Sequence, residues 1–415
     1  MMINLRSLLL SLLAVAALTV SSRTETETEK KLRDLSRAGG APAGRAIDGR
    51  SSRSGEAEPV AANAGAADEP AVALPRGVVV AQANPGVPVA EQDAVATLVR
   101  MAKEQVRAQH AADGLARRDA HAKHHGCVEA SFAVLNEDLL PENLRRGVFQ
   151  PGARYPAVIR FSNGAGSPRP DGKGDGRGMA VKLLGVPGPK LHPSESGTQD
   201  FLMINHPAFF VRSAEDYVDF MKSASGGSFP AGFFFNGLPW NWRMKELGVV
   251  LAIARQSPTD MLGLRYFSMV PYRFGPDRNM KYSAKPCAER KKGYPAESEN
   301  FLRENLATAL ASEEACFDFM VQLQAPGMSL EDSVVEWREK ASPFVPVARI
   351  LIKPQSFDAP ERMTACENLS YTPWHAVPEH EPLGPINAVR LAVYDAVSEL
   401  RHALNAAPRA EPRPF

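Results

Sequence analysis

Short apolar runs, each bounded by glycine, proline or aspartate clusters, most constrain what this chain can fold into. Between residues 121 and 211 they include YPAVIRF at 155–161, MAVKLL at 179–184 and FLMI at 201–204. Further runs follow at 265–274, 317–324 and 345–353. Apolar runs of this length between turn-forming residues predict a series of short β-strands joined by turns.

Helical patterns flank these runs. Apolar residues at three- and four-residue spacing begin at Asp93, and residues 213–223 and 240–255 also look helical. The chain closes with a helix predicted from Pro385 to Leu404, where proline occupies its favourable first position. Strands in the middle and helices at the ends predict an α+β fold built on an antiparallel sheet or barrel.

The N-terminus has the composition of a targeting segment. Arg6 precedes an uncharged run from Ser7 to Val20, which is rich in leucine and alanine and is followed by small residues. This order is typical of a secretory signal peptide, and the run is shorter than the ~20 residues of a membrane span. A buried helix and an uncleaved anchor are the alternatives. We predict a signal peptide over residues 1–22 and export to the periplasm or the extracellular space.

Residues 23–92 contain no aromatic side chain and are rich in alanine, glycine, arginine, serine, proline and glutamate. Such a segment cannot bury enough apolar surface to offset the entropy lost on ordering. The sequence therefore predicts a disordered spacer over 23–92, one folded domain over 93–405 and a disordered tail over 406–415.

Charge and cysteine content narrow the partners. The net charge of +1 does not favour electrostatic capture of nucleic acid or of an acidic membrane.

No pair among the four cysteines has C-x-x-C spacing, which argues against a zinc or iron–sulfur site. In an oxidising compartment they could form two disulfides, with three possible pairings, or they stay separate buried thiols. These cysteines are Cys127, Cys287, Cys316 and Cys366.

Three histidines, His121, His124 and His125, lie in the cationic segment RRDAHAKHHG. A single histidine is more often structural than catalytic. The segment also lacks the carboxylates and the second half that a zinc site needs. A nearby glycine-rich segment, DGKGDGRG at 171–178, fits neither nucleotide-binding pattern and leads into a strand.

Arg160 lies inside the apolar run AVIRFSN at 157–163. Strand alternation places its side chain opposite those of Ile159 and Phe161 and on the same face as Ser162. Burial of a guanidinium without an anionic partner is costly, so the pattern alone favours a solvent-facing Arg160.

Arg390, Tyr394 and Arg401 share one face of the C-terminal helix, because residues four and seven apart lie near whole turns. A guanidinium one turn from a phenol favours the phenolate, the form that binds ferric iron. The spacing alone favours the alternative, a core-facing tyrosine with two solvated arginines.

Taken together and in order, these segments resemble the catalase superfamily over residues 115–405. Each motif is short, and the resemblance rests on their shared order in one chain. They are Arg118 with HAK at 121–123, IRFS at 159–162, DGRGMAVK at 175–182, NHPAFFVR at 205–212, LEDSVVEW at 330–337 before RILI at 349–352, and Arg390, Tyr394 and Arg401.

The resemblance implies a catalase-type antiparallel β-barrel with flanking helices and a site for haem b. It makes His121 the distal acid–base catalyst, oriented by Ser162. It makes Tyr394 the proximal phenolate ligand of the iron, held by Arg390. The other implied haem contacts are Arg118, Arg160 and Arg401 at the propionates, Phe209 on the distal side, and Tyr217 at a second aromatic position.

One position departs from the family pattern. Ile204 stands where catalases carry a catalytic asparagine, and Asn205 follows it. Either Asn205 takes that role, or the polar anchor for a second hydrogen peroxide is missing and an organic hydroperoxide can enter. The smaller Ala120 replaces the usual valine before the distal histidine.

The resemblance thus implies a haem-dependent oxidoreductase of the catalase or peroxidase type that acts on hydrogen peroxide or an organic hydroperoxide. The alternatives are an enzyme that rearranges lipid hydroperoxides and a haem-binding protein without activity. The family's flavodoxin-like C-terminal domain is not found, so no NADPH binding is expected. No nucleic acid partner is expected, and a homo-oligomer is left open.

Overall fold

The computed structural model describes residues 89–225, 229–290 and 293–413. The predicted signal peptide and all but the last four residues of the predicted spacer lie outside these ranges. Residues 89–92 belong to the first helix, which begins at Val89 and so starts four residues before Asp93.

Strands and helices follow one another in the predicted broad order. The strands are β1 (His124–Val134), β2 (Arg154–Asn163), β3 (Arg177–Leu184), β4 (Thr198–Ile204), β5 (Tyr266–Phe267), β6 (Tyr272–Phe274), β7 (Arg278–Pro286), β8 (Ala315–Leu323) and β9 (Val345–Ile352). The α-helices are α3 (Val89–Asp113), α4 (Ala214–Ser223), α5 (Ala231–Phe234), α6 (Met244–Ala254), α7 (Phe301–Leu310), α8 (Pro360–Asn368) and α9 (Pro385–Leu404). Short 3₁₀ turns are η1 (Glu142–Leu144), η3 (Pro239–Asn241), η4 (Met261–Gly263) and η5 (Pro378–His380).

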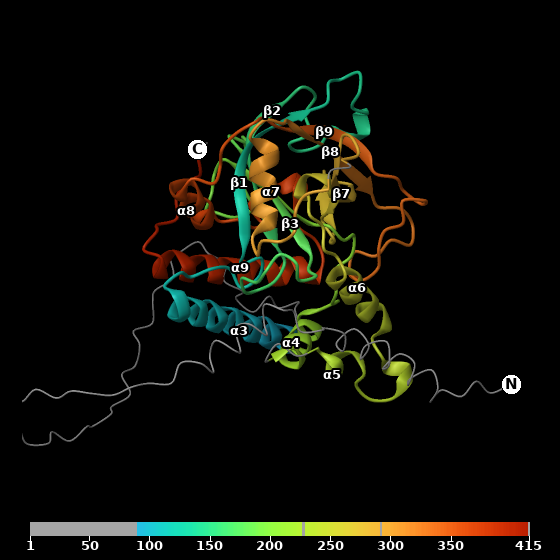
Figure 1. The fold of residues 1–415 in the computed structure, drawn as a ribbon. Coiled ribbons are helices and arrows are strands. Elements are labelled where there is room, and N and C mark those ends of the chain that lie inside the picture. Colours follow the sequence, from blue (N-terminus) through green and yellow to red (C-terminus); the bar gives the residue numbers. More distant parts are fainter. Residues whose placement is uncertain (1–88, 226–228, 291–292, 414–415) are drawn as a thin grey trace, which may run out of the picture. The chain divides into compact units, whose positions relative to one another are not determined.

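The sheet closes into a barrel. Its strands follow the order β5, β4, β3, β2, β1, β9, β8, β7, and the pairing of β5 with β7 completes the ring (Figure 1). Every pairing in this ring is antiparallel, and β6 pairs with another stretch of β7. The structure therefore confirms the predicted antiparallel barrel with flanking helices.

Aromatic side chains fill the barrel. The ring centroid of Phe319 lies 4.7 Å from that of Phe201 and 5.2 Å from that of Phe132. Tyr282 packs on the same cluster, 5.1 Å from Phe201. Because these side chains are almost completely buried, the interior of the barrel is a packed core, and a ligand site has to lie outside it.

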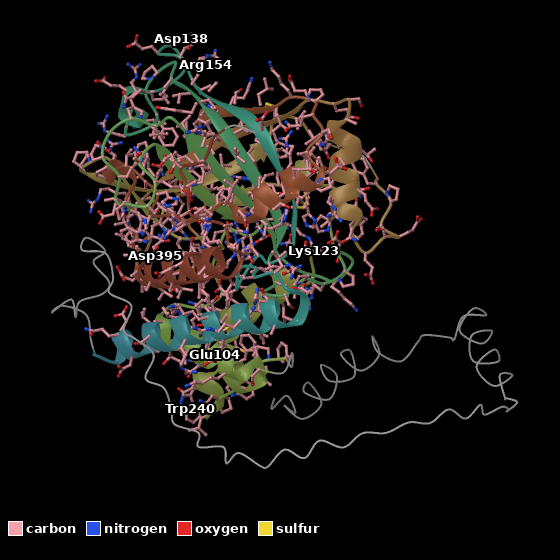
Figure 2. All side chains as sticks on the ribbon, turned by 90° about the vertical axis from the view of Figure 1, so that its left-hand side faces the viewer. Glu104, Lys123, Asp138, Arg154, Trp240 and Asp395 are labelled. Atoms are coloured by element: carbon pink, nitrogen blue, oxygen red, sulfur yellow. A yellow bond between two sulfur atoms is a disulfide. The ribbon has the colours of Figure 1, made fainter. Side chains whose placement is uncertain are left out.

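Helices α3, α4 and α9 form a layer with an apolar cluster of its own. Helix α3 lies beside α9 (Figure 1), and Figure 2 shows α3 between α9 and the segment that carries the exposed Trp240. The cluster consists of small and branched side chains, which allow the helices to pack closely: Ala94, Leu98, Ala102, Val106, Ala116, Ala214, Val218, Val389, Val393 and Val397. This packing fixes the position of α9 relative to the loop that follows α3.

Several elements match their predicted ranges, and the last helix matches its predicted bounds. The run at 265–274 forms two short strands, β5 and β6, in place of one. Strand β7 and helices α7 and α8 have no counterpart among the predicted elements. None of the helices in the described ranges combines the length and apolarity needed to cross a membrane.

Two disulfides join distant parts of the chain. Cys127 of β1 pairs with Cys366 of α8, and Cys287 pairs with Cys316 at the start of β8. This selects one of the three possible pairings and leaves no free thiol among the described residues. At the C-terminus, Glu411 accepts hydrogen bonds from the backbone N–H of Gly197 and its neighbour, although the sequence predicts a disordered tail there.

Candidate active site

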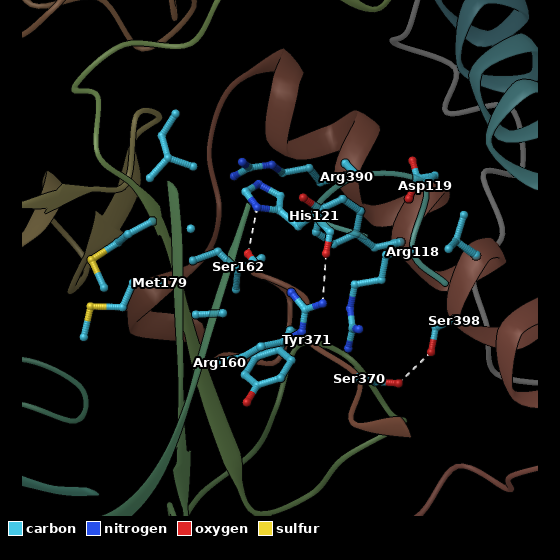
Figure 3. Close-up of a pocket in the computed structure, with 18 of the residues that line it drawn as sticks. Arg118, Asp119, His121, Arg160, Ser162, Met179, Ser370, Tyr371, Arg390 and Ser398 are labelled. Atoms are coloured by element: carbon cyan, nitrogen blue, oxygen red, sulfur yellow. Dashed lines mark hydrogen bonds between the residues drawn. The ribbon is translucent and has the colours of Figure 1, made fainter. Parts of the chain in front are cut away.

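A pocket of about 740 Å³, part of it open to solvent, lies between α9 and one end of β2, β3 and β4. The pocket brings together most of the residues predicted for the site, as Figure 3 shows in part: Arg118, His121, Arg160, Ser162, Arg390, Tyr394 and Arg401.

The loop between α3 and β1 carries two of these residues, and both neighbouring helices hold it. From α3, the Gln105 amide donates to the carbonyl of Asp119 at 2.8 Å. At the end of α9, the Asn405 side chain both accepts from and donates to the backbone of Ala116, at 2.9 and 3.0 Å. These hydrogen bonds satisfy backbone polar groups of a loop that has no regular structure of its own. They therefore fix the position of His121.

His121 has a left-handed backbone, with φ at 58°. Its N–H donates to the Gly164 carbonyl at 3.1 Å, and its own carbonyl accepts from the Arg160 guanidinium at 2.8 Å. Its ring Nδ1 lies 3.0 Å from Ser162 Oγ. Backbone strain held by this many partners is typical of functional sites.

The imidazole of His121 is neutral at physiological pH. Burial, reinforced by the positive charge of Arg160, lowers the pKa of His121 to about 4. The tautomer in which Nδ1 donates to Ser162 leaves Nε2 as a proton acceptor. The pair can therefore do general base chemistry in the pocket.

Gly178 of β3 makes room for this pair. A Cβ at Gly178 would lie 2.6 Å from Ser162 Oγ and 2.7 Å from His121 Nδ1, closer than side chains approach one another. Gly178 pairs with Ser162 across the sheet, so the strand cannot move away without breaking the ladder. A glycine at this position is thus required by the position of the histidine ring.

Arg160 lies opposite Ile159 and Phe161, as strand alternation predicts, but its predicted exposure to solvent is wrong. The residue is 3% exposed, because the outer face of β2 is covered at the pocket. Its Nε is buried and has no hydrogen-bond partner among the described residues. The pocket therefore contains a buried cationic group with unused donor capacity.

Arg118 and Arg401 complete a cluster of three guanidinium groups around one carboxylate. Glu367 Oε1 accepts from Arg118 at 3.0 Å and from Arg401 at 2.7 Å. Burial raises the pKa of Glu367, but Arg118, Arg401 and Arg160 outweigh it and lower that pKa to about 2. Burial and Arg118 lower the pKa of Arg401 to about 10, so it stays protonated at neutral pH.

This cluster and the pocket wall fit a haem. Two of the three guanidinium groups, those of Arg118 and Arg401, pair with one carboxylate, so positive charge is left over for the two propionates of such a group. The donor Nε of Arg160 is free for the same purpose. The rest of the lining is largely apolar, as a porphyrin needs, and includes Met179, Ala180, Leu202, Ile204, Met269 and Val397.

Tyr394 lines the pocket from α9, with Arg390 one turn before it. The Arg390 guanidinium carbon lies 5.9 Å from the centroid of the Tyr394 ring, and its Nη1 donates to Asn387 Oδ1 at 3.3 Å. Burial works against the charged form of Arg390, but Tyr394 and other phenols raise its pKa above the usual value. A charged arginine is thus held beside the Tyr394 phenol.

Three predicted residues lie outside the pocket lining. The Asn205 Oδ1 accepts from the backbone N–H of Arg177 at 2.7 Å, and its amide nitrogen donates to Gln256. The structure therefore does not bring Asn205 into the pocket, where Ile204 is found instead. Phe209 and Tyr217 form an aromatic pair with centroids 6.1 Å apart, behind Arg390.

Sequence reasoning missed two acidic groups at the site. Glu367 lies on a helix that was not predicted, and no nearby motif pointed to it. Asp119 was overlooked although it is adjacent to Arg118, and it lines the pocket. Burial raises the pKa of Asp119 to about 6.

The histidines next to His121 do not join it in a metal cluster. His125 Nε2 lies 2.9 Å from Asn163 Oδ1, and His124 Nε2 lies 3.4 Å from Glu367 Oε2. Within the described residues, one group has the spacing of a metal site: Glu195, Asp200 and His375. Lys182 contacts all three, with its Nζ 2.7 Å from Asp200 Oδ1. The side-chain ammonium group of Lys182 therefore already balances the negative charge of this buried group.

This chain is similar in sequence to a catalase family model and to a catalase-related peroxidase, and in fold to solved catalases. A family model described as catalase matches residues 83–227. The catalase-related peroxidase of Mycolicibacterium paratuberculosis is 26% identical over 273 residues, which are 63% of this chain and 82% of that protein.

Two solved structures share the fold. A fungal catalase matches with a TM-score of 0.57 and 17% identity, and catalase A from Saccharomyces cerevisiae with 0.56 and 17%. The matches cover 73% of this chain but 63% and 66% of those chains, so this chain spans less than two thirds of either catalase. In the family match, the barrel and the order of its site motifs, this chain is therefore similar to catalases and to the related peroxidase.

Proposed function

We propose that this protein is a haem-dependent oxidoreductase that acts on peroxides. The proposal extends to Tyr394 as the proximal phenolate ligand and His121 as the distal acid–base catalyst. The observation that carries it is the meeting of three sets of residues in one pocket: the His121–Ser162 pair, the arginine cluster and Tyr394. The family match and the related peroxidase support the reaction class.

Residues of this chain would hold the cofactor at its propionates and at its iron. Arg118, Arg160 and Arg401 would bind the propionates, and Arg390 would stabilise the ionised form of Tyr394. When bound, haem supplies the iron and the electrons for cleavage of a peroxide O–O bond.

His121 would move the proton. Its neutral imidazole can take a proton from one peroxide oxygen and return it to the other, which is acid–base work worth about 10²–10⁴-fold in rate. Ser162 fixes the ring by its contact with Nδ1, and Arg160 fixes the backbone at the same residue. The chain therefore supplies a positioned base in the pocket.

A second candidate substrate is an organic or lipid hydroperoxide. Ile204 lines the pocket where catalases have asparagine, and the amide of Asn205 is engaged elsewhere. An apolar wall there favours an alkyl chain over a second hydrogen peroxide.

We also propose that the protein is exported, since two disulfides are typical of oxidising compartments.

The test is an oxygen-electrode assay with hydrogen peroxide, run beside a guaiacol-type peroxidase assay with hydrogen peroxide and with an alkyl hydroperoxide. Haem-loaded wild type should turn over at least one of these substrates, and His121→Ala should lose most of the rate while it keeps its haem. An inactive wild type with full haem content would leave only haem binding as the function.

A further inference from the structure

We propose that the Cys127–Cys366 disulfide sets how tightly the site retains an anionic cofactor, because it fixes the helix end that orients Arg118 and Arg401. This inference rests on the proposed function, since the cofactor in question is the haem of that site. It assigns to α8 a positioning role and makes cofactor retention sensitive to thiol oxidation.

The C-terminal end of α8 contacts both arginines through backbone and side chain. Arg118 donates to Glu367 Oε1 at 3.0 Å and to the Leu369 carbonyl at 2.5 Å. Arg401 donates to the same carboxylate oxygen at 2.7 Å and also to the Glu367 carbonyl. A helix C-terminus carries partial negative charge, so both kinds of contact favour guanidinium groups at this position.

These contacts orient groups that otherwise repel one another. Burial, followed by Arg118 and Arg401, lowers the pKa of Arg160, and burial with Arg118 lowers the pKa of Arg401, while Glu367 opposes both effects. Without a fixed counter-charge, the guanidinium groups would move apart or turn toward water. A preorganised cluster binds two propionates at a lower entropic cost than a mobile one.

The C-terminal end of helix α8 is held by the disulfide and by the contacts of Glu367. Its two buried residues are Cys366 and Glu367, and its other side chains are partly or fully exposed. The apolar cluster beneath it is small and is centred on the disulfide: Cys127, Val158, Leu184 and Cys366, with Leu369 packed against it. The covalent bond to β1 therefore ties this helix end to the barrel alongside the contacts of Glu367 with the arginines and with His124.

Reduction of this disulfide should thus loosen the arginine cluster and leave the barrel intact. The barrel has its own continuous core and strand ladder, and neither depends on α8. The second disulfide, Cys287–Cys316, offers a matched comparison, because neither of its cysteines lies on α8, whose end binds Arg118 and Arg401.

The experiment compares haem binding by three proteins: wild type, Cys127→Ala/Cys366→Ala, and the control Cys287→Ala/Cys316→Ala. Each apoprotein is titrated with haem and, separately, with haem dimethyl ester, whose propionates carry no charge. We expect removal of Cys127–Cys366 to weaken haem binding by about tenfold, or about 1.4 kcal/mol. Binding of the ester should change by less than about twofold, because the arginines have no carboxylate to hold.

The two ligands separate orientation of the arginines from general damage to the pocket. Equal weakening for haem and its ester would mean that the disulfide only supports the pocket, and unchanged binding of haem would also overturn the inference. If the alanine variant does not fold, wild type reduced with a phosphine and checked by circular dichroism replaces it. A wild type that binds no haem would refute the proposed function itself, a result distinct from both.

Discussion

The most specific prediction concerns Gly178→Ala. A Cβ there would lie 2.6 Å from Ser162 Oγ and 2.7 and 2.9 Å from atoms of the His121 ring, where ordinary contact begins at 3.4 Å. The new methyl group cannot retreat, because Gly178 pairs with Ser162 on one side and Ile204 on the other. The histidine and serine must therefore move by up to about 0.8 Å or turn to other rotamers.

A shift of this size should affect chemistry much more than folding. Misplacement of a catalytic group by about 1 Å costs on the order of 10²-fold in rate. Overpacking costs about 1–3 kcal/mol in stability. We expect kcat with peroxide to fall about 10²-fold while haem content stays within the range of wild type.

The assay is steady-state turnover normalised to haem, with thermal unfolding measured on the same samples. Gly248→Ala in α6 is the matched control, because a Cβ there meets nothing within 4 Å. It should leave both kcat and haem content unchanged. Full activity of Gly178→Ala would refute the reasoning, since His121 would then tolerate a displaced ring or would not take part in turnover.

Three further predictions follow from the site. Because burial lowers the pKa of His121 to about 4, its imidazole stays neutral above that pH. The value of kcat/KM should therefore stay level from pH 7 to 5 and decline as the pH falls through 4. A decline near pH 6.5 would contradict the assignment of His121 as the base. Glu367→Gln leaves Arg118 and Arg401 without their carboxylate, so urea unfolding of the apoprotein should show a loss of about 3–5 kcal/mol, and a loss under about 1 kcal/mol would exclude a buried ion pair. Ile204→Asn should raise the ratio of oxygen released from hydrogen peroxide to alkyl hydroperoxide consumed, and an unchanged ratio would show that Ile204 does not select the substrate.

Much of the fold could be predicted because it depends on local patterns. The last helix begins at a proline and has an apolar stripe, so both of its ends could be read from the sequence. Strands β2, β3 and β4 also coincide with apolar runs. Strand β7 was missed because the prediction relied on continuous apolar runs, whereas its sequence RNMKYSAKP carries the alternation of a half-buried strand.

The site was predicted less completely because the burial of its residues depends on tertiary packing, which the local sequence does not reveal. Alternation gave the correct face for Arg160, but only the packing of α9 across that face shows that it is buried. Glu367 lies on a nine-residue helix with no amphipathic stripe. Its role as a carboxylate partner depends on two arginines that are 249 and 34 residues away in the sequence. The role expected of Asn205 failed for a similar reason, since its amide is held by Arg177 and Gln256.

The central claim is that Tyr394 binds the iron of a haem. The most direct test is the absorbance spectrum of haem-reconstituted Tyr394→Phe, with Tyr371→Phe as the control, since Tyr371 lines the same pocket and donates to the Val158 carbonyl at 3.4 Å. We predict that Tyr394→Phe loses or shifts the Soret and charge-transfer bands typical of phenolate-ligated ferric haem, and that Tyr371→Phe keeps them. A Tyr394→Phe protein with the bands of wild type would contradict the account.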